Sequence, residues 1–241
     1  MASALAVTEI GVNAMGAPAA NPTITVPVGG VPRGAFAILS WVTDSTGTET
    51  SVTDSAGNKY VLMAAATFNG SADRLRAYGG YIGTALGSGS TLTVNISSNT
   101  LQMQGVYITG QRAGEYLTVR DGPELNKNNA ATATALTASA TGQTLQDDII
   151  VFACYGYASA TASFTATSPF VQTGLTNKVS SNGFTHAMTY SIKTAQGNFT
   201  PAATLGTTAV YGTLTFMLKA GLGRLLPQPG SNQAVLRAMG R

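Results

Sequence analysis

The chain has 241 residues, of which 10% are charged, against about 25% in ordinary globular proteins. Hydrophobic residues make up 44%, so the chain can form a packed core and is neither disordered nor a charge-dense nucleic-acid binder. One cysteine, Cys154, excludes an intrachain disulfide, and one histidine, His186, leaves little for metal or histidine-based acid–base chemistry. These counts remove most enzyme classes, and we expect no metal site and no cofactor.

The formal net charge of +3 is concentrated near the C-terminus. The last 23 residues hold four basic side chains and no acid, whereas the rest of the chain holds nine basic and ten acidic residues. The basic isoelectric point is therefore a property of the tail. Elsewhere the polarity comes mainly from uncharged residues, including 34 threonines, and such a surface packs against a neighbour without burying ions. This favours a subunit of a larger assembly.

The beginning of the chain is a poor signal peptide, because it lacks a positive stretch and contains Glu9. No run of about 18 apolar residues occurs, so we expect no membrane-spanning helix.

Strand patterns follow one another along the chain. An apolar run at 35–43 predicts a central strand. Glycine and serine clusters, at the spacing of a β-sandwich, separate it from further strand-like runs at 51–54, 59–64, 74–78, 91–96 and 101–109. We predict an all-β, jelly-roll-like β-sandwich with extended terminal arms and no helix before the tail.

The two halves of the chain resemble each other. Residues 35–43 correspond to 148–155, 81–94 to 190–200, and 105–109 to 212–218. A duplicated β unit, with two sheets supplying one core, is one interpretation, and generic strand–turn patterning is the other. The predicted boundaries are an N-terminal arm (1–22), a first β unit (23–125), a crossover loop (126–142), a second β unit (143–220) and a basic C-terminal arm with a short helix (221–241).

Few residues are candidates for chemistry. The segment 54–58 has Asp and Asn at alternate positions, but it lacks the further oxygen ligands and terminal glutamate of a calcium-binding EF-hand loop. We interpret it as a hairpin turn in which Gly57 and Asn58 tolerate a positive φ. The adjacent Asp147 and Asp148 point to opposite faces of a strand and cannot form a glycosidase carboxylate pair.

Two further side chains have structural and chemical interpretations. Cys154 lies in an apolar strand and is interpreted as a small core residue. His186 could serve a distant serine, but the chain has no G-x-S-x-G nucleophile motif. We therefore predict no catalytic residues.

The tail is apolar and basic at 221–230, and Ser231 or Asn232 is a candidate cap for a short helix after it. A helix this short is marginal alone, so it must dock on another surface, whereas a frayed terminus is the alternative. The residues predicted to bind a neighbouring subunit are Leu222, Arg224, Leu225, Leu226, Leu236 and Arg237.

The segments 53–60, 81–94 and 211–219 together resemble β-sandwich domains of tailed-bacteriophage structural proteins and of some secreted bacterial proteins. The resemblance covers about residues 23–220 and rests on strand–turn patterns. It implies a virion component, such as a capsid decoration (cement) protein or a tail or fibre subunit, and it carries over no catalytic residues. The expected partners are further copies of the chain and other virion proteins, with no direct contact to nucleic acid or membrane.

A carbohydrate- or surface-binding module of the tail-fibre or adhesion type is the alternative function. Its candidate aromatic residues for a host-surface glycan are Tyr78, Tyr81, Tyr155 and Tyr157, for which ordinary β packing is the competing interpretation. A polysaccharide-degrading enzyme is a third class. We expect a non-enzymatic protein located in the virion.

Overall fold

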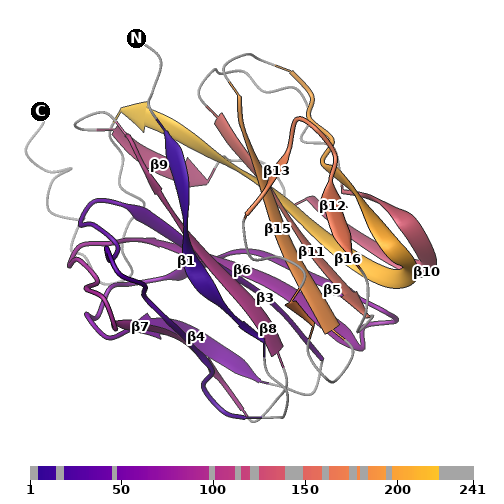
Figure 1. Ribbon diagram of the computed structural model, residues 1–241, viewed down its shortest axis with the longest axis horizontal. Helices are drawn as coiled ribbons and strands as arrows, with labels where there is room; N and C mark the ends of the chain where they lie inside the picture. The colour runs from indigo at the N-terminus through magenta and orange to yellow at the C-terminus, as the bar shows by residue number, and fades with distance from the viewer. Residues whose placement is uncertain are drawn as a thin grey trace, which may run out of the picture.

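The computed structural model of the chain describes residues 5–14, 19–44, 48–97, 101–111, 115–119, 125–138, 149–158, 163–173, 178–179, 184–193 and 197–222. Every element within these ranges is a β-strand, and Figure 1 shows them packed as layered sheets. The prediction of an all-β sandwich is therefore confirmed. None of the described residues forms a helix that is long and apolar enough to span a membrane.

The first half of the chain is a jelly roll. A five-stranded sheet has the order β1-β8-β3-β6-β5, and a three-stranded sheet has the order β2-β7-β4, with antiparallel pairing throughout. This is the strand order of a jelly roll, except that β5 pairs with β6 of the large sheet rather than with β4 of the small one. The strands are β1 (Ala6–Ala14), β2 (Thr23–Thr25), β3 (Phe36–Asp44), β4 (Glu49–Asp54), β5 (Val61–Phe68), β6 (Asp73–Tyr81), β7 (Thr91–Ile96) and β8 (Leu101–Thr109).

The second half repeats this topology in one continuous, curled sheet. Its main path, β10-β16-β11-β15-β13, has the same order of connection as the five-stranded sheet. The remaining strands pair beside this path. The strands are β9 (Glu115–Val119), β10 (Leu125–Thr137), β11 (Ile149–Ala158), β12 (Phe164–Ala166), β13 (Val171–Gln172), β14 (Lys178–Val179), β15 (Phe184–Lys193) and β16 (Ala202–Leu222).

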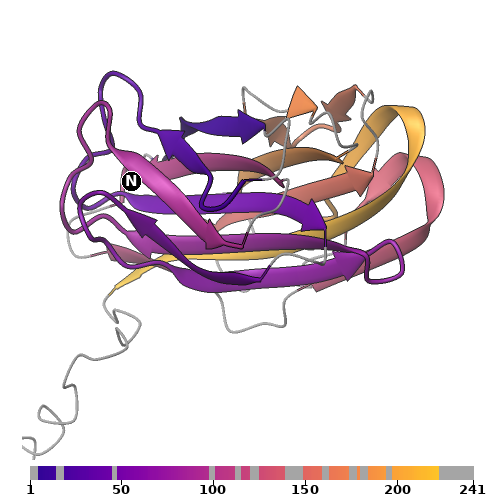
Figure 2. The same cartoon turned by 90° about the horizontal axis from the view of Figure 1, so that it is seen from below.

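The curl of this sheet replaces the separate small sheet of the first half. Thr204, near the start of β16, pairs with Ala135 of β10 on one side and with Thr165 of β12 on the other. β2 and β4 flank β7 in the same way in the first half. The gold and pink strands curl together at the right of Figure 2, where β16 and β10 turn into this second layer. The described strands thus form two jelly-roll-like units.

The register of the strands aligns the two units. Tyr81 pairs with Phe36 in the first unit, and Tyr190 pairs with Phe152 in the second. If the two tyrosines correspond, Phe36 corresponds to Phe152. This position is three residues later in the chain than the one with which the sequence comparison aligns Phe36. An odd shift exchanges the two faces of a strand, so this correction decides which side chains face the neighbouring sheet.

Three large apolar cores, rather than the single core expected, hold the described layers together, and a fourth, small cluster contains Val151, Phe170 and Met217. One lies inside the first unit and includes Trp41, and a second lies inside the second unit and includes Tyr157. The third lies between the two units and is lined by the even-numbered residues of both central strands. Its largest contributors are Phe36, Ile38, Phe68, Leu75, Ile108, Ile150, Phe152, Met188, Leu214, Phe216 and Leu218.

The central strands of the two units pack face to face in a nearly symmetric way, whereas β5 contacts β16 and β10 without an equivalent contact of similar extent from β13 among the described strands. β3 contacts β11, β8 contacts β15, and β6 contacts β16. Because β8 corresponds to β16 and β6 to β15, exchanging the units converts these contacts into one another. This is the pattern of an approximate two-fold relation within one chain.

The structure corrects the predicted boundaries. The predicted N-terminal arm (1–22) contains β1, because Ile10 faces the first unit's core while Val7 packs against the core between the units. The predicted crossover loop (126–142) lies mostly in β10, where the unusually long β16 supplies a pairing partner for a segment poor in large side chains. β9 and the start of β10 therefore belong to the second unit, not to the first one.

Two glycines make room for the aromatic ring of Phe68 between the units. Gly156 pairs with Gly212 across β11 and β16, and a Cβ at Gly212 would lie 2.5–2.9 Å from Phe68. Phe68 is fully buried, so it has little freedom to move away.

We therefore expect Gly212→Ala to destabilise the protein by roughly 1–3 kcal/mol through overpacking against Phe68. Urea or thermal unfolding of the purified chain measures this. Gly87→Ala is the matched control, because a Cβ there has no neighbour within 4 Å. Combining Gly212→Ala with Phe68→Leu should recover part of the loss, and equal effects of the two glycine substitutions would contradict the packing argument.

Candidate functional site

The fold brings His186 to a distant serine, Ser40. Ser40 lies on β3 of the first unit and His186 on β15 of the second, and 2.9 Å separates the Ser40 Oγ from the His186 Nε2. Both side chains face the core between the units, where Ser40 is 0% and His186 3% exposed. No sequence motif links the two positions, so only the packing of the units reveals the pair.

The polarity of this pair is opposite to that of a catalytic Ser–His pair. The Ser40 hydroxyl donates its proton to the carbonyl of Arg76 at 2.8 Å, so its oxygen accepts from the His186 Nε2–H. A general base would instead accept the serine proton. Among the described residues no carboxylate orients Nδ1, and the pair is sealed from solvent. The arrangement therefore ties the two units together and is unsuited to hydrolysis.

Cys154 completes this cluster from β11. It is fully buried, as predicted for a core residue. Burial raises the pKa of its thiol to about 12, and a hydrogen bond with Ser40 opposes only part of the shift. The thiol therefore stays protonated and is not a nucleophile at neutral pH.

Two glutamines extend the polar cluster along β8. The Gln102 Oε1 accepts a hydrogen bond from the His186 backbone N–H at 3.0 Å, and Gln104 donates through Nε2 to the Thr173 hydroxyl. All these side chains are buried between the units. We call Ser40, Gln102, Gln104, Thr173 and His186 the polar seam.

A pair of carboxylates lies at the end of the same sheet. Asp44 and Asp73 are direct cross-strand partners on β3 and β6, and the Asp73 Oδ2 accepts from the Asn69 amide at 2.9 Å. Burial raises the pKa of Asp73, the Asn69 hydrogen bond opposes part of this shift, and the charge of Asp44 adds a smaller increase. A glycosidase places its carboxylates across an open cleft, whereas these are neighbours on one sheet and Asp73 is buried. Sequence reasoning missed this pair because it depends on strand register.

The segment 54–58 forms a turn, but not a hairpin. β4 pairs with β7 and β5 pairs with β6, so the turn connects two different sheets. Gly57 has a φ of 78°, as expected, whereas Asn58 does not have a positive φ. Asn58 instead joins this turn to the next loop, since its side chain exchanges two hydrogen bonds of 2.9 Å with the backbone of Thr84.

Both oxygens of the Asp54 carboxylate, the group that suggested a calcium loop, already accept hydrogen bonds from the protein. The Asp54 Oδ1 accepts from the backbone N–H groups of Ala56 and Asn58, and the Oδ2 accepts from the Asn58 amide and the Tyr60 hydroxyl, at 2.8–3.0 Å. Burial and this contact raise the pKa of Tyr60. Asp54 therefore acts as a structural acceptor that fixes the turn.

Three loops of the first unit meet at one end and are fixed by backbone hydrogen bonds. We call residues 26–35, 54–60 and 82–90 the loop end. Val31 and Leu86 form an antiparallel bridge, and Gly34 donates to Ile82 at 2.8 Å. Val28 projects from this surface with 93% exposure. The only charged residues in these loops are Arg33, Lys59 and the internally bonded Asp54.

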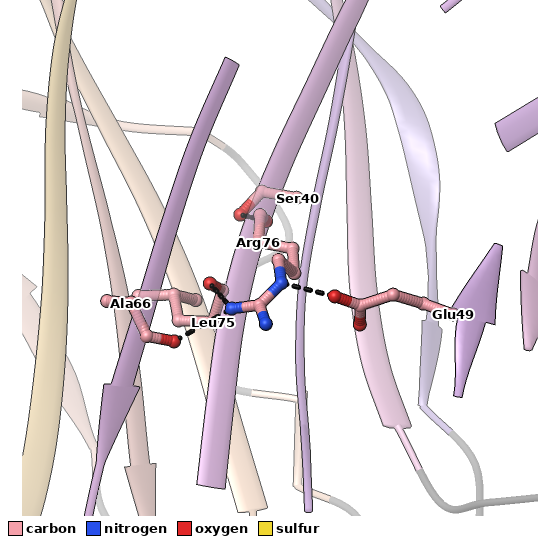
Figure 3. A network of polar contacts seen from close by, with 5 residues as sticks. All are labelled: Ser40, Glu49, Ala66, Leu75 and Arg76. Atoms are coloured by element: carbon pink, nitrogen blue, oxygen red, sulfur yellow. Dashed lines mark hydrogen bonds and ion pairs between the residues drawn. The ribbon is translucent and has the colours of Figure 1, made fainter. Parts of the chain in front are cut away.

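An ion pair joins the large and small sheets of the first unit at the side of their core (Figure 3). The Arg76 Nε bonds to the Glu49 carboxylate, and its Nη1 donates to the carbonyls of Ala66 and Leu75 at 3.0 and 3.1 Å. Both charged side chains are only 13% exposed. Through these contacts Arg76 holds the large sheet and the small sheet of the first unit together.

The aromatic residues proposed for glycan binding are mostly used in packing. Tyr155 and Tyr157 are fully buried in the second unit, so they cannot present a surface to a glycan. Tyr78 stacks on Trp41 at 5.1 Å, and Tyr81 meets Phe36 edge-on at 5.0 Å. Tyr78 and Tyr81 keep part of their surface exposed.

The predicted subunit-binding residues fall almost entirely beyond the described strands. Leu222 ends β16, where its backbone pairs with Glu115. Arg224, Leu225, Leu226, Leu236 and Arg237 lie outside the described residues, as do Asp147 and Asp148. Their assignment stays a prediction from sequence.

Comparisons of the chain with protein-family models, with curated proteins and with solved structures found no match.

The buried histidine predicts acid-dependent stability. Burial lowers the pKa of His186 to about 3, whereas the unfolded side chain has its ordinary pKa near 6.5. Between these values the unfolded state binds a proton that the folded state excludes, so stability falls as the pH falls. We expect a contribution of up to about 1.4 kcal/mol per pH unit, measured by urea unfolding between pH 6.5 and 5.

His186→Gln is the matched variant, because it keeps a donor toward Ser40 and cannot titrate. Its slope between pH 6.5 and 5 should be smaller than that of the natural chain. Asp73 contributes equally to the pH dependence of both proteins. The difference between the two slopes therefore measures the contribution of His186, the chain's single histidine. Identical slopes would show that His186 does not resist protonation in the folded state.

Proposed function

We propose that the protein is a non-enzymatic structural subunit of a bacteriophage virion, a capsid decoration (cement) or tail-associated protein that binds further copies of itself. The loop end carries this proposal. Its loops are already fixed by hydrogen bonds, so a partner that binds them costs little conformational entropy. Apart from the projecting Val28 and the charged Arg33 and Lys59, the surface of the loop end consists mainly of small uncharged residues. Removing water from such residues costs little free energy.

The architecture agrees with this proposal. Jelly rolls recur in viral capsid proteins, although a fold alone does not determine a function. The described Ser–His and carboxylate pairs have the wrong polarity or burial for hydrolysis. The resemblance of the segments 53–60, 81–94 and 211–219 to phage structural domains adds the virion as the location, and other virion proteins as partners.

The apolar and basic tail supplies a second contact in this proposal. Leu222, Arg224, Leu225, Leu226, Leu236 and Arg237 would bind a neighbouring copy as an arm. β16 ends at Leu222, so a cut after this residue leaves every described strand intact.

A carbohydrate-binding module is the second candidate, because jelly rolls also occur in lectins. Tyr78 and Tyr81 are the partly exposed aromatics that would carry it. A glycan array with the natural chain and with the Tyr78→Ala and Tyr81→Ala variants tests this function. Binding that the substitutions abolish would favour the module over the structural subunit.

We expect the full chain to form a defined oligomer at micromolar concentration, as measured by size-exclusion chromatography with light scattering. Val28→Asp should weaken it at least tenfold, because the charge would have to be buried in the contact. Removing residues 223–241 should also reduce the number of subunits in the oligomer. The melting temperature of the truncated chain should stay close to that of the full chain.

Thr53→Asp is a matched control for the loop-end substitution, because Thr53 is exposed on β4, outside the three loops. A monomer at every concentration would contradict self-association. An oligomer that neither Val28→Asp nor truncation affects would contradict the surfaces named here.

A further inference from the structure

The interface between the two units is polar on one side of its approximate two-fold axis and apolar on the other. Ser40 pairs with Gln104 across β3 and β8, as Gly156 pairs with Gly212 across β11 and β16. On the glycine side, Phe68 fills the space. On the other side the corresponding positions carry the polar seam, in which buried hydrogen-bonding groups replace the aromatic ring.

Three atoms of the polar seam have no partner among the described residues. They are the Gln102 Nε2, the Gln104 Oε1 and the His186 Nδ1. Each belongs to a side chain that is at least 97% buried, so solvent does not reach it. An unmet polar group at such a position costs roughly 1–3 kcal/mol, and buried polar groups are therefore almost always paired.

The three atoms belong to residues that neighbour one another in the interface. Gln102 and Gln104 are two residues apart on β8 and project from the same face. The other amide atom of Gln102 bonds to the backbone of His186, and that of Gln104 bonds to Thr173, whose hydroxyl donates to the Met188 carbonyl at 3.2 Å. Gln102 thus contacts β15 directly and Gln104 contacts it through Thr173, at positions two residues apart.

The existing hydrogen bonds fix what each free atom requires. The Oε1 of Gln102 is used as an acceptor, so its free Nε2 is a donor. The Thr173 hydroxyl donates its proton to the Met188 carbonyl and accepts a hydrogen bond from the Gln104 Nε2. The Gln104 Oε1 is therefore a free acceptor. Because His186 carries its proton on Nε2, its Nδ1 is also a free acceptor.

We propose that this part of the polar seam is a binding site for a single internal water molecule. A water donates two hydrogen bonds and accepts at least one, which matches two free acceptors and one free donor. It would donate to the His186 Nδ1 and the Gln104 Oε1 and accept from the Gln102 Nε2. The site is independent of the proposed function and joins β8 of the first unit to β15 of the second.

A high-resolution crystal structure of the full chain tests the site directly. We expect one density peak at about 2.7–3.2 Å from all three atoms, the usual range for such contacts. The proposal would be overturned if the space were closed and the Gln102 amide donated directly to the His186 Nδ1. It would equally fail if the peak contacted only one of the three atoms.

Water relaxation dispersion in solution provides a second measurement. Gln104→Met keeps the side-chain length but removes one acceptor, and we expect the loss of one long-lived water relative to the natural chain. Gln172→Met is the matched control, because Gln172 lies near the seam on β13 but is partly exposed. An unchanged number of long-lived waters in Gln104→Met would contradict the site. If that variant does not fold, the crystal structure of the natural chain still decides.

Discussion

The burial of the large sheets on both faces is the constraint on which the rest of the structure depends. Every residue of β3 from Phe36 to Thr43 is buried, because one face packs inside the first unit and the other against the second unit. β11 has the same position in the second unit. A strand covered on both faces must be apolar at successive positions, whereas the small-sheet strand β7 alternates. Threonine can therefore dominate the outer sheets without weakening the core.

The two sides of the interface satisfy this constraint by different means. Phe68 enters the space above two glycines and contributes packing and apolar burial. The polar seam contributes directional bonds that are lost when the units slide, since Ser40 and His186 meet only in one register. Buried polar contacts add little net stability but penalise alternative arrangements. The apolar side therefore accounts for most of the affinity between the units, and the polar side for their alignment.

The sequence allowed the strands to be predicted better than their partners. The apolar run at 35–43 identified a central strand because burial on both faces leaves a local pattern. β10 was missed because its residues are small and polar, and its strand conformation depends on β16, far along the chain. The Ser40–His186 and Asp44–Asp73 pairs depend on register and on packing between units, for which no local pattern exists. The loop end was only partly predictable, since Gly57 indicated a turn but not its bonds to Thr84.

The internal two-fold relation limits how copies of this chain would associate in the proposed function. A symmetric dimer needs a self-complementary face. In each unit, the face of the large sheet that points away from the unit's own core already packs against the other unit of the same chain. The loop end belongs to the first unit and lies away from that interface. A contact between it and a different surface of a second copy would be head-to-tail. Such contacts close into rings or extend into rows, which suits a repetitive particle surface better than an isolated pair.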